Sequence, residues 1–242
     1  MRHYHGTPIG GTTARADEFC EGRHVLIPWN RPEDLDRAQG LSRGFVVDNS
    51  AFTFWKTKET PQWPDYCEWV RGFENDPRFD FALIMDVIDG TEELNDMLIE
   101  MWKSFRVKRG CPVWHLHESL ERLKRLCLEW PQVAIGSSGQ WPTPGQGDWW
   151  HRMDEAMEVA TDGRGYPLTR LHGLRMLRAD IIEAYPWSSC DSTNAVQNGT
   201  REAAKNGVDT CWGRMTIARR IERAQSPSRW SGNHQMQFEL TG

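Results

Sequence analysis

Short apolar runs alternate along the chain with longer stretches in which apolar residues repeat at helical spacing, as Leu94, Leu98 and Met101 do. The apolar runs predict strands at 2–5, 24–29, 45–49, 81–87, 111–116, 132–137, 168–173 and 185–190. The other stretches predict helices near 32–39, 62–73, 92–107, 118–129, 149–161, 174–183, 199–206 and 212–224. Strands that alternate with helices pair in parallel, and eight of them close into a barrel. The pattern therefore predicts an α/β fold, the TIM (β/α)8 barrel.

We expect the barrel to be a single domain over residues 1–210, with residues 211–242 forming a basic helix and a tail packed on it. The chain of 242 residues is long enough for a sizeable core. A doubly wound open sheet is the main competing architecture. Nothing favours a dinucleotide-binding version of it, because no Gly-x-Gly-x-x-Gly follows the first predicted strand.

The composition indicates a soluble protein with a polar surface. Hydrophobic residues make up 38% of the chain and the mean hydropathy is −0.66. No apolar run approaches the roughly 20 residues that a membrane span needs, and the amino terminus lacks the apolar core of a signal peptide. The six cysteines are scattered and include no Cys-x-x-Cys, a pattern that favours reduced thiols in a cytoplasm and disfavours a thiolate zinc site.

Polar side chains stand at the ends of the predicted strands, and in a barrel these ends meet at one rim. In chain order they are His3, His5, Trp29, Asn30, Asp48, Asn49, Asp86, Asp89, His115, His117, Gly136, Ser137, Ser138, His172, Gly173 and Asp191. The first loop, 6–11, adds glycines that allow close approach to a ligand. The informative feature is that Asp48, Asp86 and Asp191 end three separate apolar strands, since structural carboxylates usually lie on helix surfaces or at helix caps.

Asp191 directly follows the predicted strand 185–190, in the sequence Tyr-Pro-Trp-Ser-Ser-Cys-Asp-Ser-Thr-Asn. Its small polar neighbours leave room for a ligand beside the carboxylate, although capping of the next helix is an alternative role for this residue. Glycosyl transfer is a chemistry that several carboxylates can share: one attacks an anomeric carbon while another handles protons or holds the leaving base. A carboxylate also suits a guanine-like edge, because it accepts hydrogen bonds from two adjacent N–H donors.

Five segments, in order, resemble the tRNA-guanine transglycosylase superfamily, and most closely its phage DNA-modifying branch, the DpdA-type 7-deazaguanine DNA transglycosylases. Val46–Phe52 resembles the family strand that ends Asp-Ser-Gly-Gly-Phe, and Ile84–Asp86 the strand whose Asp binds the heterocycle. Ala134–Gly139 stands where the family has a Gly-rich segment along the base pocket. Leu171–Leu174 resembles the family's Leu-Met-Gly-Val, and Ser189–Ser192 the segment that bears the nucleophile. The resemblance covers roughly residues 1–200.

The resemblance implies that Asp191 is the nucleophile and Asp48 the catalytic acid and base. It implies a substrate-binding set of Asp86, Gly136, Ser137, Ser138, His117, His172, Gly173 and Asn49. The reaction would replace guanine in DNA, or less plausibly in tRNA, with a 7-deazaguanine such as 7-cyano-7-deazaguanine, in the cytoplasm of the host cell if the chain is phage-encoded. Asn49-Ser50-Ala51 replaces the family's Ser-Gly-Gly, and the Cys-x-Cys-x-x-Cys zinc segment is absent. We therefore expect no zinc subdomain, metal or cofactor.

A nucleic-acid partner requires local positive charge, because the net charge is −5. The densest basic segment is the predicted helix 212–224 and the loop after it, which together carry Arg214, Arg219, Arg220, Arg223 and Arg229. We expect the four helical arginines to bind nucleic acid near the barrel rim, with a solvated helix face as the alternative. Of the 13 tryptophans, most are expected in the core and some in loops where they can stack on bases.

Two other functions remain open at this point. His3, His5, the histidine that ends the fifth strand, His172 and Asp191 would suit a metal-dependent hydrolase of the amidohydrolase type, although strand six ends in Gly136-Ser137-Ser138 without a ligand. The second alternative is a barrel that binds nucleic acid without catalysis.

Overall fold

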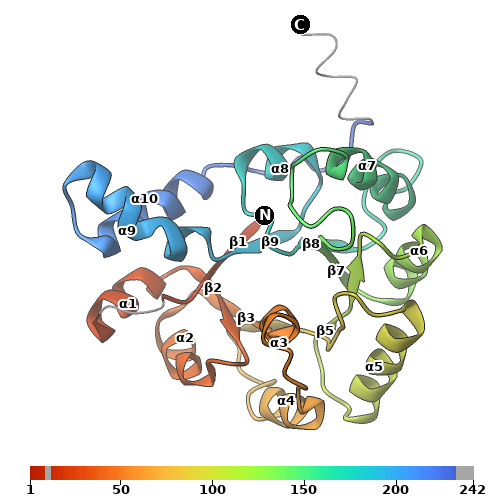
Figure 1. The fold of residues 1–242 in the computed structure, drawn as a ribbon, viewed down its shortest axis with the longest axis horizontal. Coiled ribbons are helices and arrows are strands. Elements are labelled where there is room, and N and C mark those ends of the chain that lie inside the picture. Colours follow the sequence, from red (N-terminus) through yellow and green to blue (C-terminus); the bar gives the residue numbers. More distant parts are fainter. Residues whose placement is uncertain (9–11, 233–242) are drawn as a thin grey trace, which may run out of the picture.

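The computed structural model describes residues 1–8 and 12–232, in which parallel strands form a barrel surrounded by helices (Figure 1). The strands are β1 (Arg2–Gly6), β2 (His24–Pro28), β3 (Gly44–Asp48), β4 (Phe79–Leu83), β5 (Gly110–Cys111), β6 (Val113–His115), β7 (Gln132–Gly136), β8 (Arg170–Gly173) and β9 (Ser189–Ser192). The helices are α1 (Thr13–Cys20), α2 (Leu35–Leu41), α3 (Ala51–Thr57), α4 (Trp63–Arg71), α5 (Glu92–Ser104), α6 (Leu120–Glu129), α7 (Trp149–Ala160), α8 (Ala179–Ala184), α9 (Asn194–Asn206) and α10 (Thr210–Ile221), with a 3-10 turn, η1 (Pro32–Asp34), before α2. The predicted TIM barrel is confirmed.

The barrel closes at a proline. The sheet runs β5-β4-β3-β2-β1-β9-β8-β7-β6, so its two end strands are β5 and β6, and only Pro112 separates them in the chain. Proline has no N–H to donate, which interrupts the ladder there. Its carbonyl still accepts a hydrogen bond from the amide of Ala134 on β7, at 2.9 Å. The predicted strand 111–116 is therefore one barrel position divided into two short strands.

The alternation of side chains along each strand separates two apolar cores. On β2 and β3, Val25, Ile27, Phe45 and Val47 face the surrounding helices, in the larger cluster of buried apolar residues. The inward-facing positions form a second cluster inside the barrel, composed of Tyr4, Leu26, Val46, Phe81, Leu83, Cys111, Val113 and Ala134. Side chains two positions apart on a strand point to the same side. Asp48, two positions after the inward-facing Val46, therefore also points inward.

Two helices were not predicted, and one strand lies further along than expected. Helix α1 carries few apolar residues, and α3 contains aromatic and β-branched residues of low helix propensity. The predicted strand 185–190 is instead β9 at Ser189–Ser192, so Asp191 lies within the strand rather than past its end. The apolar residues Tyr185 and Trp187 misled the prediction, because both are buried but bond to helices: Tyr185 Oη to Asp154 Oδ1 at 3.0 Å, and Trp187 Nε1 to the Ile181 carbonyl at 3.1 Å.

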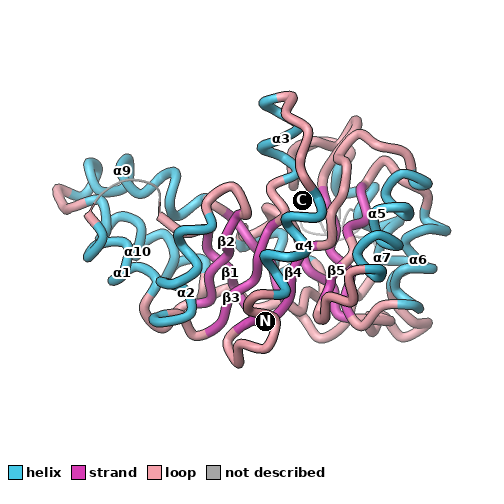
Figure 2. Tube along the Cα trace, turned by 90° about the horizontal axis from the view of Figure 1, so that it is seen from below, coloured by secondary structure: helices cyan, strands magenta, loops and turns pink. Residues whose placement is uncertain are grey.

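Helix α10 packs against α9 and α1 at the side of the barrel, and the chain after it returns to the start of β1 (Figures 1 and 2). His3 Nε2 lies 2.9 Å from the Ala224 carbonyl oxygen, and the amino terminus donates to Gln225 Oε1 at 3.2 Å. These contacts lie at the amino-terminal end of the strands. None of the helices in residues 1–8 and 12–232 combines the length and the apolar character needed to cross a membrane.

The contact between α9 and α10 requires glycine at Gly213. A Cβ added there would lie 2.2 Å from the Gly199 carbonyl oxygen and 2.7 Å from the Ala203 amide nitrogen, both of which are backbone atoms. We expect Gly213→Ala to lower the free energy of unfolding by about 1–3 kcal/mol, measured by urea denaturation. Gly40→Ala in α2 is the matched control, because a Cβ there meets nothing within 4 Å, and it should be neutral or slightly stabilising. Equal effects of the two substitutions would contradict this packing account.

Candidate active site

The carboxyl ends of the strands open into a cavity of about 280 Å³. In the side view, α3 stands above this end of the barrel (Figure 2). The residues that line the cavity are Asp48, Asn49, Ala51, Phe52, Trp55, Leu83, Asp86, Ile88, Asp89, His115, Gly136, Ser137, Ser138, Gly139, Pro142, Leu174, Arg175 and Asp191. The three carboxylates identified in the sequence, Asp48, Asp86 and Asp191, therefore share one cavity.

Two donors hold the carboxylate of Asp191 from β9. His172 Nε2, on the neighbouring strand β8, lies 3.0 Å from Asp191 Oδ2, and the Arg175 amide donates to Oδ1 at 3.1 Å. The other ring nitrogen of His172, Nδ1, lies 2.8 Å from Ser189 Oγ. When Nε2 carries the proton and donates to Asp191, Nδ1 accepts from the Ser189 hydroxyl, so a neutral imidazole satisfies both contacts. His172 is fully buried and thus acts on Asp191 rather than on a ligand.

Asp48 differs from the other two carboxylates because its only hydrogen-bond donor among the described residues is the Ser50 amide, at 2.9 Å from Oδ1. Burial raises the pKa of Asp48 to about 7, and the nearby negative charges of Asp191 and Asp86 act in the same direction, while the Ser50 amide opposes the rise. Near neutral pH the carboxyl is therefore divided between its protonated and ionised forms, which is the condition that general acid and base catalysis requires.

The Asp86 carboxylate lies between Asn49 and His115. Its Oδ1 accepts from Asn49 Nδ2 at 2.7 Å, and its Oδ2 lies 2.8 Å from His115 Nε2. Asn49 is itself fixed, because Nδ2 also donates to the Ile84 carbonyl at 2.7 Å and Oδ1 accepts from the Ala51 amide at 2.8 Å. The remaining ring nitrogen of His115, Nδ1, is buried and has no hydrogen-bond partner among the described residues.

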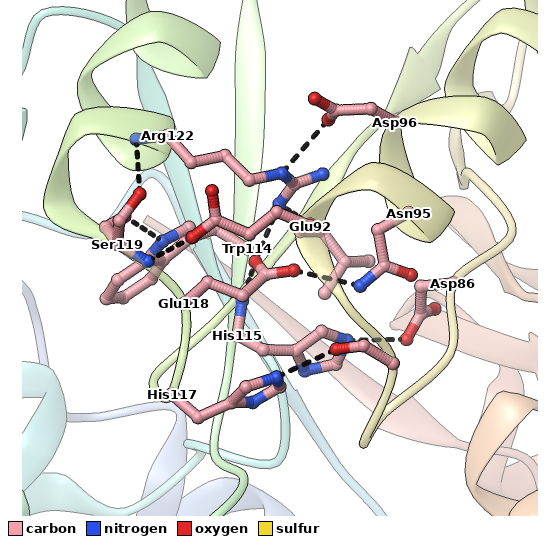
Figure 3. A network of polar contacts seen from close by, with 12 residues as sticks. Asp86, Glu92, Asn95, Asp96, Trp114, His115, His117, Glu118, Ser119 and Arg122 are labelled. Atoms are coloured by element: carbon pink, nitrogen blue, oxygen red, sulfur yellow. Dashed lines mark hydrogen bonds and ion pairs between the residues drawn. The ribbon is translucent and has the colours of Figure 1, made fainter.

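A buried polar network between β6 and helices α5 and α6 supports the backbone of His115 (Figure 3). Glu118 Oε2 accepts from the His115 amide at 2.8 Å and from Arg122 at 2.6 Å, and its Oε1 accepts from Asn95 at 2.8 Å. Arg122 also pairs with Asp96, at 3.0 Å. The network ties β6 to helices α5 and α6, and it fixes the backbone that carries His115.

The predicted substrate-binding residues are only partly brought together. Asp86, Asn49, Gly136, Ser137 and Ser138 line the cavity. His117 does not line it: it is exposed, its ring stacks on His115 at a centroid distance of 5.8 Å, and its Nδ1 lies 2.7 Å from Ser138 Oγ. Gly173 does not line it either, because its α-carbon faces outward, where a Cβ would lie 2.9 Å from Cys190 Sγ. The structure therefore places Gly173 outside the cavity, and His172 reaches the site only through Asp191.

The predicted convergence of the histidines of β1 on the rim is also wrong. His3 and His5 alternate with Tyr4, which points into the barrel, so both face outward. His5 Nε2 lies 3.2 Å from Glu222, in the turn after α10. In residues 1–8 and 12–232, no group of three or more His, Cys, Asp or Glu side chains is arranged to hold a metal ion. Ile9, Gly10 and Gly11 of the first loop lie outside the described residues.

The basic helix does not present its arginines to the rim. Arg214 is buried against α9, Arg220 pairs with Glu202 at 2.7 Å, and Arg219 and Arg223 are exposed. The carboxyl end of α10 lies near the amino-terminal end of β1, which is the opposite end of the barrel from the cavity. The expectation that α10 lies beside the mouth is therefore wrong. Helical spacing alone did not reveal which arginines pack against α9.

Comparison with solved structures identifies the same fold. The chain is similar to the tryptophan synthase α-subunit of the hyperthermophile Pyrococcus furiosus. One mutant of that subunit matches with a TM-score of 0.51 and 10% identity, over 91% of this chain and 96% of that one. A second mutant matches with a TM-score of 0.50 and 10% identity, over 89% and 95%. No protein-family model and no curated protein sequence matches the chain. At this identity the likeness shows the fold alone.

The raised pKa of Asp48 makes stability depend on pH. The folded protein binds this proton up to about pH 7, whereas the unfolded chain releases it near 3.8, so the wild type should lose stability as pH rises from about 4 to about 7. Asp48→Asn removes the titration. At pH 8 we expect the variant to be more stable than the wild type by on the order of 4 kcal/mol, with little difference at pH 4, measured by urea denaturation at both values. A stability difference that does not change with pH would contradict the assigned pKa.

Proposed function

We propose that the chain exchanges guanine in a nucleic acid, with DNA as the preferred polymer, for a 7-deazaguanine through a covalent intermediate on Asp191. One observation carries the proposal: two carboxylates that share one cavity have different surroundings. Asp191 is held by His172 Nε2 and by the Arg175 amide, whereas the pKa of Asp48 is raised to about 7. Such a pair supplies a nucleophile and a proton carrier, the two groups that glycosyl transfer with a covalent intermediate needs.

The proposed reaction has two half-steps. An Asp191 oxygen attacks C1′ of the nucleotide as the C1′–N9 bond breaks, and protonated Asp48 gives its proton to the departing guanine. The incoming 7-deazaguanine then loses its N9 proton to Asp48, and its N9 attacks C1′, which releases Asp191 from the ester. Asp48 is protonated again at the end, so the cycle balances without a cofactor.

Asp86 and His115 are suited to hold the base. A carboxylate has about four acceptor positions, and Asn49 and His115 occupy two of those on Asp86. The remaining positions can accept from the N1–H and the exocyclic amine of a guanine-like ring. His115 Nε2, which lies 2.8 Å from Oδ2, fixes the Asp86 carboxylate for this role. This recognition requires the target nucleotide to leave its stack or to be single-stranded.

The geometry supports the two alternatives less well. A metal-dependent hydrolase would use His3 and His5, which face outward from the barrel toward the C-terminal segment. A barrel that only binds nucleic acid would have no use for a carboxyl whose pKa is near 7 beside a fixed carboxylate.

Base exchange is the direct test of this proposal. Purified protein is incubated with radiolabelled guanine or 7-cyano-7-deazaguanine and with single-stranded DNA, duplex DNA or tRNA in parallel, and label in the polymer is counted. We expect label to enter DNA, and Asp191→Asn to reduce the rate by several orders of magnitude while Tm is retained, because the attacking charge is lost. Exchange that survives in Asp191→Asn would refute the role of Asp191 as the nucleophile. Label that enters only tRNA would refute DNA as the preferred polymer.

A further inference from the structure

An arginine stands at the rim of the cavity on a backbone that favours glycine. Arg175 has φ of 61°, in the left-handed region that L residues other than Gly, Asn and Asp rarely adopt. Its amide is fixed by the hydrogen bond to Asp191 Oδ1 at 3.1 Å. Glycine would fit this backbone without steric cost. The backbone conformation therefore does not explain why residue 175 is an arginine.

The charge of the cavity gives that explanation. Four aspartates line it, namely Asp48, Asp86, Asp89 and Asp191, and Arg175 is the only Lys or Arg among the described residues that line it. The side chain is exposed, and within the described chain its guanidinium contacts no carboxylate. A nucleic-acid phosphate that approaches this rim meets repulsion from the aspartates unless a cation compensates, and Arg175 is placed to do so.

Aromatic side chains on α3 support the guanidinium. Its Cζ lies 4.6 Å from the centroid of the Phe52 ring, and Phe52 in turn stacks on Trp55 with a centroid distance of 5.8 Å. Trp55 Nε1 donates to Asp89 at 2.9 Å, and Lys58 Nζ lies 5.1 Å from its ring centroid. Phe52 and Trp55 remain 44% and 40% exposed although both line the cavity. Exposed rings interleaved with cations are the typical surface for single-stranded nucleic acid.

We propose that Arg175, Phe52 and Trp55 form a strand-binding site, which receives the part of a single strand that adjoins the nucleotide in the cavity. Arg175 binds the phosphate beside that nucleotide, and the exposed aromatic surface of α3 contacts the neighbouring base. The site rests on the proposed function for the identity of the nucleotide. It also links the polymer to the nucleophile, since the backbone of Arg175 holds Asp191 while its side chain holds the phosphate.

Arg175→Gly tests the site with little risk to the fold, because glycine suits the left-handed backbone and keeps the amide that bonds Asp191. Binding of a short fluorescein-labelled single-stranded DNA containing one guanine is measured by anisotropy over a range of salt concentrations. We expect affinity to fall about 5- to 50-fold and the slope of log affinity against log salt to flatten by about 0.7. Phe52→Leu with Trp55→Leu should weaken binding about 5- to 100-fold without changing the slope. Tm should be unchanged or slightly raised in Arg175→Gly.

The matched controls are Arg219→Gln and Trp212→Leu, exposed residues of α10, which packs on α9 and α1 at the side of the barrel and does not line the cavity, and both should bind the strand as the wild type does. Wild-type affinity and salt slope in Arg175→Gly would overturn the phosphate assignment. A loss of the same size in the α10 controls would overturn the single-strand site. Base exchange is measured separately on the wild type. If strand binding depends on these residues but no exchange occurs, the proposed function alone is refuted. If exchange occurs but the variants bind the strand as the wild type does, this site alone is refuted.

Discussion

The carboxylates of Asp48, Asp86 and Asp191 share a cavity of about 280 Å³, and the surrounding structure is arranged to make that possible. Like charges so close together are costly, and the chain offsets each one differently. Asp191 receives hydrogen bonds from His172 and from a backbone amide, and Asp86 lies between an amide and an imidazole. Asp48 has one donor within the described chain, and the proton is its remaining means of neutralisation. The differences in reactivity that the proposed mechanism uses are a consequence of this constraint.

The supports extend well behind the cavity. His172 is held at both ring nitrogens: Nε2 lies 3.0 Å from Asp191 Oδ2, and Nδ1 lies 2.8 Å from the hydroxyl of Ser189, two positions before Asp191 on the same strand. His115 depends on the buried Glu118, which joins the end of β6 to helices α5 and α6. The Asp191 side of the cavity therefore rests on contacts between neighbouring strands, while the Asp86 side rests on packing between helices and sheet.

The sequence predicted the barrel and the three carboxylates because both depend on local patterns: a strand of period two directs Asp48 inward whatever its neighbours are. It failed where tertiary contacts decide. The apolar residues Tyr185 and Trp187 suggested a strand, yet their side chains bond to helices, and β9 begins only at Ser189. Arg214 read as a surface cation and is buried on α9. Arg175 and the α3 aromatics were overlooked, since no periodic pattern marks a left-handed arginine or a seven-residue helix above a cavity.

In the proposed mechanism Asp191 carries the sugar between the two half-steps. It is tested most directly by acid-quenching the protein during exchange on a short guanine-containing DNA, then measuring intact mass and mapping the modified peptide. We expect a protein species heavier by the mass of the oligonucleotide without its guanine, with the bond on the peptide that contains Asp191, and no such species in Asp191→Asn. Base exchange that proceeds without any adduct, or with an adduct on another residue, would contradict it.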